Sequence, residues 1–376
     1  MTYGLYIHLP FCKSKCPYCS FASVTTSDIN IIEEYAGAVA FELLHRHRGI
    51  FEGNPKTVYI GGGTPSLIPA FLIQNIVQDI SCSPLQEFTI EANPESIDEQ
   101  WLDDVLEAGT NRISIGVQSL DDEILTTLGR FHDTKHAMES IVLVRKAGFT
   151  NVSVDLIFGV PGQTMNTWKQ TLARILELEP DHVSGYCLSV EEDTVFYKMA
   201  SSGGLQIPNQ EETADMYCVM CELLDKSGLL RYEISNFARA GYECKHNMGY
   251  WTFTPYLGIG SSAHSYDGKV RSWNESDPVS YIDDCVIKGE ATSGYEVIDE
   301  RTHIFETVML SLRTVNGLDM RQISVTDTDT GNKLDNKIHD LTESGFLTVN
   351  KKGHIVLTNR GAVLSNEIIA EIVCVI

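Results

Sequence analysis

Short apolar runs alternate with stretches of helical period over the first half of the chain. Helical patterns, such as Ile31–His47 and Asp133–Ala147, separate runs that have the length and the β-branched content of buried strands. Six strand–helix repeats predict an α/β fold in which a parallel sheet curls into an open, partial (β/α)6 TIM-like barrel. The predicted strands are Leu5–Leu9, Thr57–Ile60, Phe88–Glu91, Arg112–Gly116, Val152–Phe158 and His182–Leu188.

The pattern changes after about residue 203. A helix is expected at Gln210–Gly228 and a short strand at Tyr232–Ser235, followed by aromatic-rich loops. The last part reads as two helices, a hairpin with strands Phe346–Val349 and His354–Leu357, and a final helix, which predicts a small winged-helix-like α+β domain. The chain therefore divides into a barrel, an extension and a C-terminal domain, at residues 1–235, 236–299 and 300–376.

Composition excludes several classes of function. The formal net charge is −23 and no Lys/Arg cluster interrupts it, so direct binding to nucleic acid is not expected. No apolar run reaches the roughly 20 residues of a membrane span. We expect a cytoplasmic protein, at most peripheral to the inner face of the membrane through client proteins. Its ten cysteines then read as reduced thiols or metal ligands.

The residues with the most chemical character lie where the predicted strands end. Cys12 follows the first strand, Gly61-Gly-Gly-Thr-Pro65 follows the second and Glu91 ends the third. Gln118 comes just past the fourth strand, and Asp155 lies within the fifth. Because the carboxyl ends of parallel barrel strands share one mouth, these side chains are expected to converge there.

Cys12-Lys-Ser-Lys-Cys16-Pro-Tyr-Cys19 is a C-x3-C-x2-C loop directly after a strand. Three soft thiolates this close together can hold three corners of an iron–sulfur cube and leave the fourth iron without a protein ligand. A structural zinc site is the alternative, but zinc takes four ligands in paired spacings, and no matching pair lies nearby. We therefore predict a [4Fe–4S] cluster on Cys12, Cys16 and Cys19.

This loop resembles the signature of the radical S-adenosylmethionine (SAM) superfamily. The resemblance implies that SAM binds the open iron and is cleaved, by an electron from the cluster, to methionine and a 5′-deoxyadenosyl radical. The glycines after the second strand would let backbone approach the methionine moiety, and Arg130 could grip a carboxylate. By this resemblance SAM should contact Tyr6, Tyr18, Gly62, Gly63, Thr64, Glu91, Gln118, Arg130 and Asp155, with Ser189 and His264 lining the same cavity.

Within the superfamily the chain is similar, over nearly its whole length, to the oxygen-independent coproporphyrinogen III oxidase-like family. Two features depart from the oxidases of that family. Phe21 occupies the position of their fourth cysteine, and only eleven residues precede Cys12, where the oxidases have a longer arm over the substrate. The segments that carry the similarity are 6–12, 61–66, 116–119, 155–164 and 258–264.

His246-Asn-Met-Gly-Tyr-Trp251 resembles the H-N-x-x-Y-W signature of the haem chaperone (HemW) subgroup. The resemblance implies that His246, Tyr250 and Trp251 contact haem, with the imidazole as an axial ligand. The alternative is that His246 and Trp251 only tether this loop to the barrel. Cys244 could be a further thiolate ligand, although we interpret it as a surface cysteine.

The resemblance thus implies a haem carrier that binds a cluster and SAM, delivers haem to respiratory apoproteins and needs an electron donor. The alternative is an enzyme, an oxygen-independent coproporphyrinogen III oxidase that decarboxylates porphyrinogen propionates by radical chemistry in haem biosynthesis. No catalytic residue is assigned for that reaction. The pair Cys218 and Cys221 lies in a helical pattern and is interpreted as part of the core.

Overall fold

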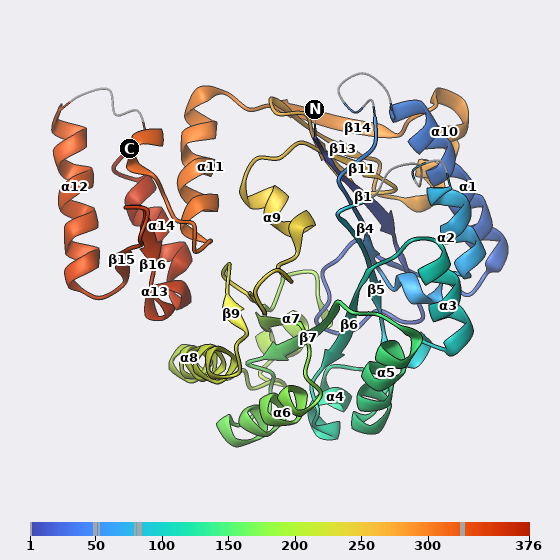
Figure 1. The fold of residues 1–376 in the computed structure, drawn as a ribbon, viewed down its shortest axis with the longest axis horizontal. Coiled ribbons are helices and arrows are strands. Elements are labelled where there is room, and N and C mark those ends of the chain that lie inside the picture. The colour runs from blue at the N-terminus through green and yellow to red at the C-terminus, as the bar shows by residue number, and fades with distance from the viewer. Residues whose placement is uncertain (1, 48–50, 52, 79, 81–84, 324–327) are drawn as a thin grey trace.

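The computed structural model describes residues 2–47, 51, 53–78, 80, 85–323 and 328–376. Within these residues, twelve strands form one curved sheet in the order β14-β13-β12-β11-β1-β4-β5-β6-β7-β8-β10-β9. Figure 1 shows this sheet in the middle of the molecule, with helices outside it and the C-terminal domain to one side. The edge strands β14 and β9 do not pair with each other, so the barrel is open, as predicted.

The six strands expected from the apolar runs are all present and parallel. Their central residues are almost wholly buried, because helices cover the outer face of the sheet and side chains inside the barrel cover its inner face. The strand β11 (Tyr256–Ile259) adds a seventh parallel member beside β1, which the sequence analysis did not anticipate. The six predicted strands are β1 (Gly4–Leu9), β4 (Thr57–Gly62), β5 (Glu87–Ala92), β6 (Arg112–Gln118), β7 (Val152–Phe158) and β8 (His182–Cys187).

The outer helices begin at the polar residues that favour helix starts. Asp98, Asp133, Thr164 and Asn209 each accept a backbone N–H of the first turn, which satisfies donors that the helix itself leaves free. These four helices bury apolar residues in the same core as the strands of the sheet. The outer helices are α1 (Ile29–Arg46), α2 (Ala70–Val77), α3 (Glu99–Glu107), α4 (Asp122–Thr127), α5 (Thr134–Ala147), α6 (Met165–Glu177), α8 (Gln210–Lys226) and α10 (Pro278–Lys288).

The strand expected at Tyr232–Ser235 is wrong. These residues form the turn between the short antiparallel strands β9 (Leu230–Arg231) and β10 (Asn236–Ala238). The Glu233 carboxylate accepts a hydrogen bond from the Ser235 backbone N–H at 3.3 Å, which favours a turn over an extended strand.

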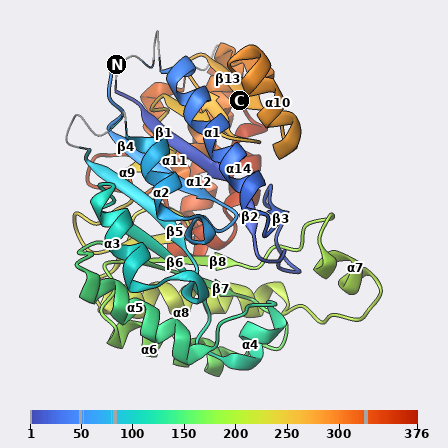
Figure 2. The ribbon, with the colours of Figure 1, turned by 90° about the vertical axis from the view of Figure 1, so that its right-hand side faces the viewer.

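The extension after residue 236 enlarges the same sheet. Strands β12 (His264–Tyr266), β13 (Val270–Asn274) and β14 (Thr292–Val297) run antiparallel beyond β11. The helix α9 (Lys245–Trp251) lies on the concave side of the sheet in Figure 1. In Figure 2, α7 (Val195–Ser201) stands out on the same side as the loop between β2 (Phe11–Cys12) and β3 (Val24–Thr25).

The C-terminal domain has the predicted winged-helix-like arrangement and its own apolar core, which includes Val308, Leu334 and Ile372. The Arg231 guanidinium donates to the Leu357 carbonyl at 2.8 Å and so ties this domain to the barrel. No helix in the described part of the chain is long and apolar enough to cross a bilayer. The domain consists of α11 (Glu300–Leu312), α12 (Thr328–Glu343), β15 (Leu347–Val349), β16 (Ile355–Leu357), α13 (Asn359–Val363) and α14 (Ser365–Val373).

Candidate functional site

The cysteine loop is held at the carboxyl end of β1. Cys12 ends β2, and the Cys19 backbone N–H donates to the Cys16 carbonyl at 3.1 Å, which folds the loop into a turn. The Phe196 N–H at the start of α7 donates to the Pro17 carbonyl at 2.9 Å. All three thiols are free and only partly buried, so they are available as ligands.

A cavity of about 690 Å³ opens beside this loop and extends into the barrel. Its wall comes from the ends of β4 to β8, the region where the strand-end residues were expected to converge. The structure brings most of the predicted site residues together in this wall, namely Cys12, Cys16, Tyr18, Cys19, Gly62, Gly63, Thr64, Glu91, Gln118, Arg130, Asp155 and Ser189.

The glycine turn after β4 packs directly against the cysteine strand. A Cβ on Gly63 would lie 2.5 Å from the Phe11 carbonyl oxygen, and Gly62 has a φ of +120°, so neither position accepts a side chain without strain. The Thr64 hydroxyl lies 3.6 Å from Cys12 Sγ. The backbone at Gly62 and Gly63 therefore lies next to the thiols, with no side chain in between.

Glu91 lies in β5 with its carboxylate facing the cavity. Oε1 accepts a 2.7 Å hydrogen bond from the Tyr59 hydroxyl, and Oε2 accepts the Gly62 backbone N–H at 3.3 Å. Burial raises the pKa of Glu91 to about 7, although the Tyr59 hydrogen bond partly offsets that effect. The carboxyl group can therefore accept or donate a hydrogen bond near neutral pH.

Asp155 and Gln118 complete the polar wall on β7 and β6. The Ser114 hydroxyl donates to Asp155 at 3.0 Å, and burial raises the pKa of this carboxyl group. Gln118 ends β6 with a φ of +66°, a left-handed conformation that is uncommon outside glycine. Strained residues of this kind cluster at functional sites, and Gln118 lines the cavity.

Arg130 links the cysteine loop to two strands. Its guanidinium donates to Asn93 Oδ1 at 2.7 Å and to the Gly116 carbonyl at 3.0 Å, and Nη1 lies 3.8 Å from Cys16 Sγ. Its buried Nε has no hydrogen-bond partner among the described residues. An anionic group in the cavity would supply the missing acceptor.

Two of the predicted SAM-contacting residues lie apart from the cavity wall. The Tyr6 hydroxyl lies 2.9 Å from His8 Nδ1, and its ring centroid is 6.2 Å from that of Tyr59, which does line the cavity. His264 begins β12, is exposed, and has its ring centroid 5.8 Å from that of Trp273. The structure thus places Tyr6 one side chain behind the wall and gives His264 no place in it.

The His246 segment forms α9, at the opposite end of the barrel from the cysteine loop. The buried imidazole lies between Thr57 Oγ1, 2.9 Å from Nδ1, and the Tyr250 hydroxyl, 2.8 Å from Nε2. Burial lowers the pKa of His246 to about 3, and the charge of Arg112 adds to this effect. Both ring nitrogens are occupied, as the tether interpretation requires, and Trp251 is partly buried at the end of the helix.

The interpretation of Cys244 as a surface cysteine is wrong. Its side chain is fully buried, and Sγ lies 3.3 Å from Glu87 Oε1. The same carboxylate accepts the backbone N–H groups of Lys245 and His246 at 2.8 and 3.0 Å, so it anchors the start of α9. Cys221, on the inner face of α8, is buried in the core as expected, whereas Cys218 is only partly buried and lies outside that core.

Sequence reasoning missed the lower part of the cavity wall. In β6, Arg112-Ile-Ser-Ile-Gly-Val-Gln118, every second residue is polar or glycine, and all four of these residues line the cavity. That alternation was a readable signal for an inward-facing set. Asn247, the second residue of the H-N-x-x-Y-W segment, also lines this cavity, whereas His246 and Tyr250 line a separate pocket of about 290 Å³.

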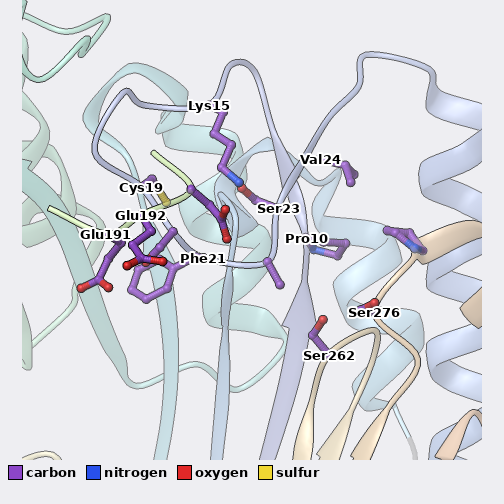
Figure 3. Close-up of a pocket in the computed structure, with 14 residues that line it drawn as sticks. Pro10, Lys15, Cys19, Phe21, Ser23, Val24, Glu191, Glu192, Ser262 and Ser276 are labelled. Atoms are coloured by element: carbon purple, nitrogen blue, oxygen red, sulfur yellow. The ribbon is translucent and has the colours of Figure 1, made fainter. Parts of the chain in front are cut away.

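Another pocket of about 670 Å³ lies on the outer side of the cysteine loop, and Figure 3 shows it. Lys15, Phe21, Glu191 and Glu192 lie around it. Phe21 keeps 69% of its surface exposed. A large apolar side chain this exposed beside the cavity mouth is available for contact with an apolar ligand.

The residues present fit an iron–sulfur cluster. Three free cysteines share one cavity mouth. A soft thiolate donor set with open space beside it suits a cluster that keeps one iron for a second ligand. The unpaired Nε of Arg130 and the glycine backbone border that space.

Comparison with known proteins agrees with this geometry. Residues 6–175 match the radical SAM superfamily, and residues 298–364 match the HemN C-terminal domain. The chain is 35% identical over 372 residues to a protein named heme chaperone HemW from Bacillus subtilis (strain 168), a match that covers 96% of this chain and 97% of that protein. The chain belongs to the HemW family of radical SAM proteins.

A second HemW relative, from Lactococcus lactis, is 35% identical over 317 residues, with 83% of this chain and 82% of that protein covered. The fold is shared more widely. The structure of coproporphyrinogen III oxidase (HemN) from Escherichia coli, a radical SAM enzyme, superposes with a TM-score of 0.81 over 98% of this chain and 89% of that one, at 24% identity. This chain thus shares the fold of that oxidase.

Proposed function

We propose that this chain binds a [4Fe–4S] cluster on Cys12, Cys16 and Cys19, binds SAM beside it, and carries haem to respiratory apoproteins. The observation that supports this most directly is the shared cavity: three free thiols at the mouth and the polar strand-end residues in one wall. The names of the HemW relatives support haem as the cargo. The cytoplasm, at the inner face of a membrane, is the place where such clients would be met.

The chain's own residues would divide the work of binding SAM. Gly62 and Gly63 offer backbone at close range to the methionine moiety, and Arg130 offers Nε to its carboxylate. Glu91 and Asp155 supply acceptors for hydroxyl groups. When bound, the cluster supplies a low-potential electron, which an external donor protein must first provide.

Phe21 separates this proposal from an oxidase function. An exposed aromatic ring at the cavity mouth offers an apolar surface to a flat macrocycle and cannot ligate iron. His246 stays a predicted haem ligand, but its Nε2 would first have to leave the Tyr250 hydroxyl. Cys12, Cys16 and Cys19 already line the cavity, so binding of the cluster and SAM needs no such rearrangement.

Anaerobic assays of the reconstituted full-length chain test the proposal. Haem binding close to one equivalent, transfer of that haem to an apoprotein, and no decarboxylation of coproporphyrinogen III are expected. Repeated turnovers that yield protoporphyrinogen would contradict the carrier function and establish the oxidase. Failure of the wild-type chain to bind haem would contradict the proposal as well.

A further inference from the structure

The floor of the barrel cavity carries a cation that the proposed SAM set does not use. Arg112 is only 2% exposed, yet it lines the cavity. Among the described residues, its guanidinium makes one hydrogen bond, from Nη1 to Thr89 Oγ1 at 3.5 Å, and Nε has no partner. A guanidinium has five N–H donors, so this buried group lacks most of the acceptors it can take.

The nearby carboxylates do not satisfy Arg112. No carboxylate oxygen of the described residues lies within 4.0 Å of its guanidinium. Glu87 accepts from Lys245, His246 and Cys244 instead. Higher in the cavity, the Tyr59 hydroxyl donates to Glu91, and the Ser114 hydroxyl donates to Asp155. Burial raises the pKa of Glu91 to about 7 and also raises that of Asp155, so Glu91 presents less than a full negative charge to a ligand near neutral pH.

Asn247 brings a second free polar group to the same cavity. It belongs to α9, and its side-chain amide makes no hydrogen bond to another described residue. Its neighbour His246 is fixed by Thr57 and Tyr250, which holds the start of α9 in place. Arg112 is near enough to this segment for its charge to lower the pKa of His246, after the larger effect of burial.

The cavity is deep enough to hold a ligand group below SAM. Arg112 and Gln118, the first and last residues of β6, both line it, and six residues of strand span about 20 Å. Arg112 lies one inward position below Ser114, or about 7 Å along the strand, and Ser114 is paired in register with Glu91. Tyr6 is in register with Tyr59 at the level of Arg112 but lies behind the wall. The cavity-lining residues proposed to bind SAM lie at the Glu91 level or nearer the mouth, so the floor remains for another group.

We propose that Arg112 and Asn247 form a subsite for one propionate carboxylate of the tetrapyrrole cargo. This inference rests on the proposed haem-carrier function. A carboxylate is a planar acceptor that a guanidinium can bind through two parallel hydrogen bonds, and the Asn247 amide adds a third donor. The subsite gives the N of the H-N-x-x-Y-W segment a direct role, with His246 as the residue that positions it.

The test compares iron protoporphyrin IX with its dimethyl ester, which keeps the macrocycle and removes both carboxylates. The full-length reconstituted chain should bind the free acid about tenfold or more tightly than the ester, as expected for a charge-assisted hydrogen-bonded pair. Arg112→Lys keeps the charge but loses the planar fork, and Asn247→Leu keeps the size but loses the donor. Each variant should weaken free-acid binding by about tenfold and leave ester binding within about twofold.

Several results would overturn the subsite. They are equal binding of acid and ester by the wild type, equal losses for both ligands in the variants, or a loss of SAM affinity, which would assign the guanidinium to the SAM carboxylate. If Arg112→Lys does not fold, as a thermal melt would show, the Asn247→Leu comparison decides alone. A wild-type chain that binds neither ligand would instead contradict the carrier function itself, and the subsite with it.

Discussion

His246 Nε2 lies 2.8 Å from the hydroxyl of Tyr250, four residues further along α9. The other ring nitrogen, Nδ1, is hydrogen-bonded to Thr57 Oγ1 at 2.9 Å, so the imidazole joins α9 to the first residue of β4. In this arrangement both ring nitrogens of the histidine of the H-N-x-x-Y-W segment are hydrogen-bonded within the protein, and one of these bonds would have to break before the imidazole could ligate iron. Its role in fold stability can therefore be separated from a role in haem ligation.

Replacing His246 by Ala should lower the free energy of unfolding by about 2–3 kcal/mol, because it removes two buried hydrogen bonds and leaves a cavity. If the histidine is only a tether, the Soret spectrum of bound haem should not change. Denaturant unfolding and a haem titration measure the two effects. A shifted Soret band with unchanged stability would assign the imidazole to iron, and Tyr250→Phe, which frees Nε2, is the matched control.

Protonation of His246 should lower the stability of the folded chain in acid. The folded-state pKa of about 3 is below the ordinary value of 6.5, so the unfolded chain takes up the proton first. The contribution is present above pH 6.5 and is lost as the pH falls towards 3, by about 2 kcal/mol between pH 7 and pH 5. Unfolding of the wild type and of His246→Gln across this range measures it. A constant difference between the two proteins would refute the assignment.

Ionisation of Glu91 should have the opposite pH dependence and lower the stability of the folded chain as the pH rises. Burial raises its pKa to about 7, above its ordinary value of 4.5, so its contribution is complete below pH 4.5 and is lost as the pH rises through 7. In the absence of SAM, the stability of the wild type relative to Glu91→Gln should decline by about 2 kcal/mol between pH 5 and pH 8. Parallel stability curves for the two proteins would show that this carboxyl group does not titrate near neutrality.

Gly63→Ala should damage the site, because its Cβ would lie 2.5 Å from the Phe11 carbonyl oxygen, which is backbone and cannot rotate away. We expect a loss of about 1–3 kcal/mol in stability and weaker SAM binding. Gly37→Ala in α1 is the matched control, because nothing lies within 4 Å of its Cβ and helical alanine is favoured over glycine by up to about 1 kcal/mol. Equal effects at both positions would contradict the close-approach argument.

Much of the fold follows from local pattern. Strands such as Val152–Phe158 are buried on both faces, so a continuous apolar run marks them within a residue or two. The same pattern places Glu91 and Asp155 at the barrel mouth. It fails at Tyr232–Ser235, where the apolar content resembles a strand but a side-chain-to-backbone hydrogen bond makes a turn.

Other features depend on contacts that are remote in sequence. The burial of Cys244 results from Glu87, which is 157 residues away. The position of His264 outside the cavity results from how β12 pairs beyond β11. The alternation in β6 could have identified Arg112 as an inward-facing residue, but an arginine in an apolar strand is ordinarily interpreted as exposed.

The most direct test of the account is the electron paramagnetic resonance spectrum of the anaerobically reconstituted, reduced chain, recorded with and without SAM. We expect a [4Fe–4S] signal that SAM alters, that is lost when Cys12, Cys16 or Cys19 is replaced by Ser, and that survives in Cys218→Ser. A spectrum without such a cluster, or a cluster signal that SAM leaves unchanged, would contradict the assignment of the three thiols and the cavity beside them.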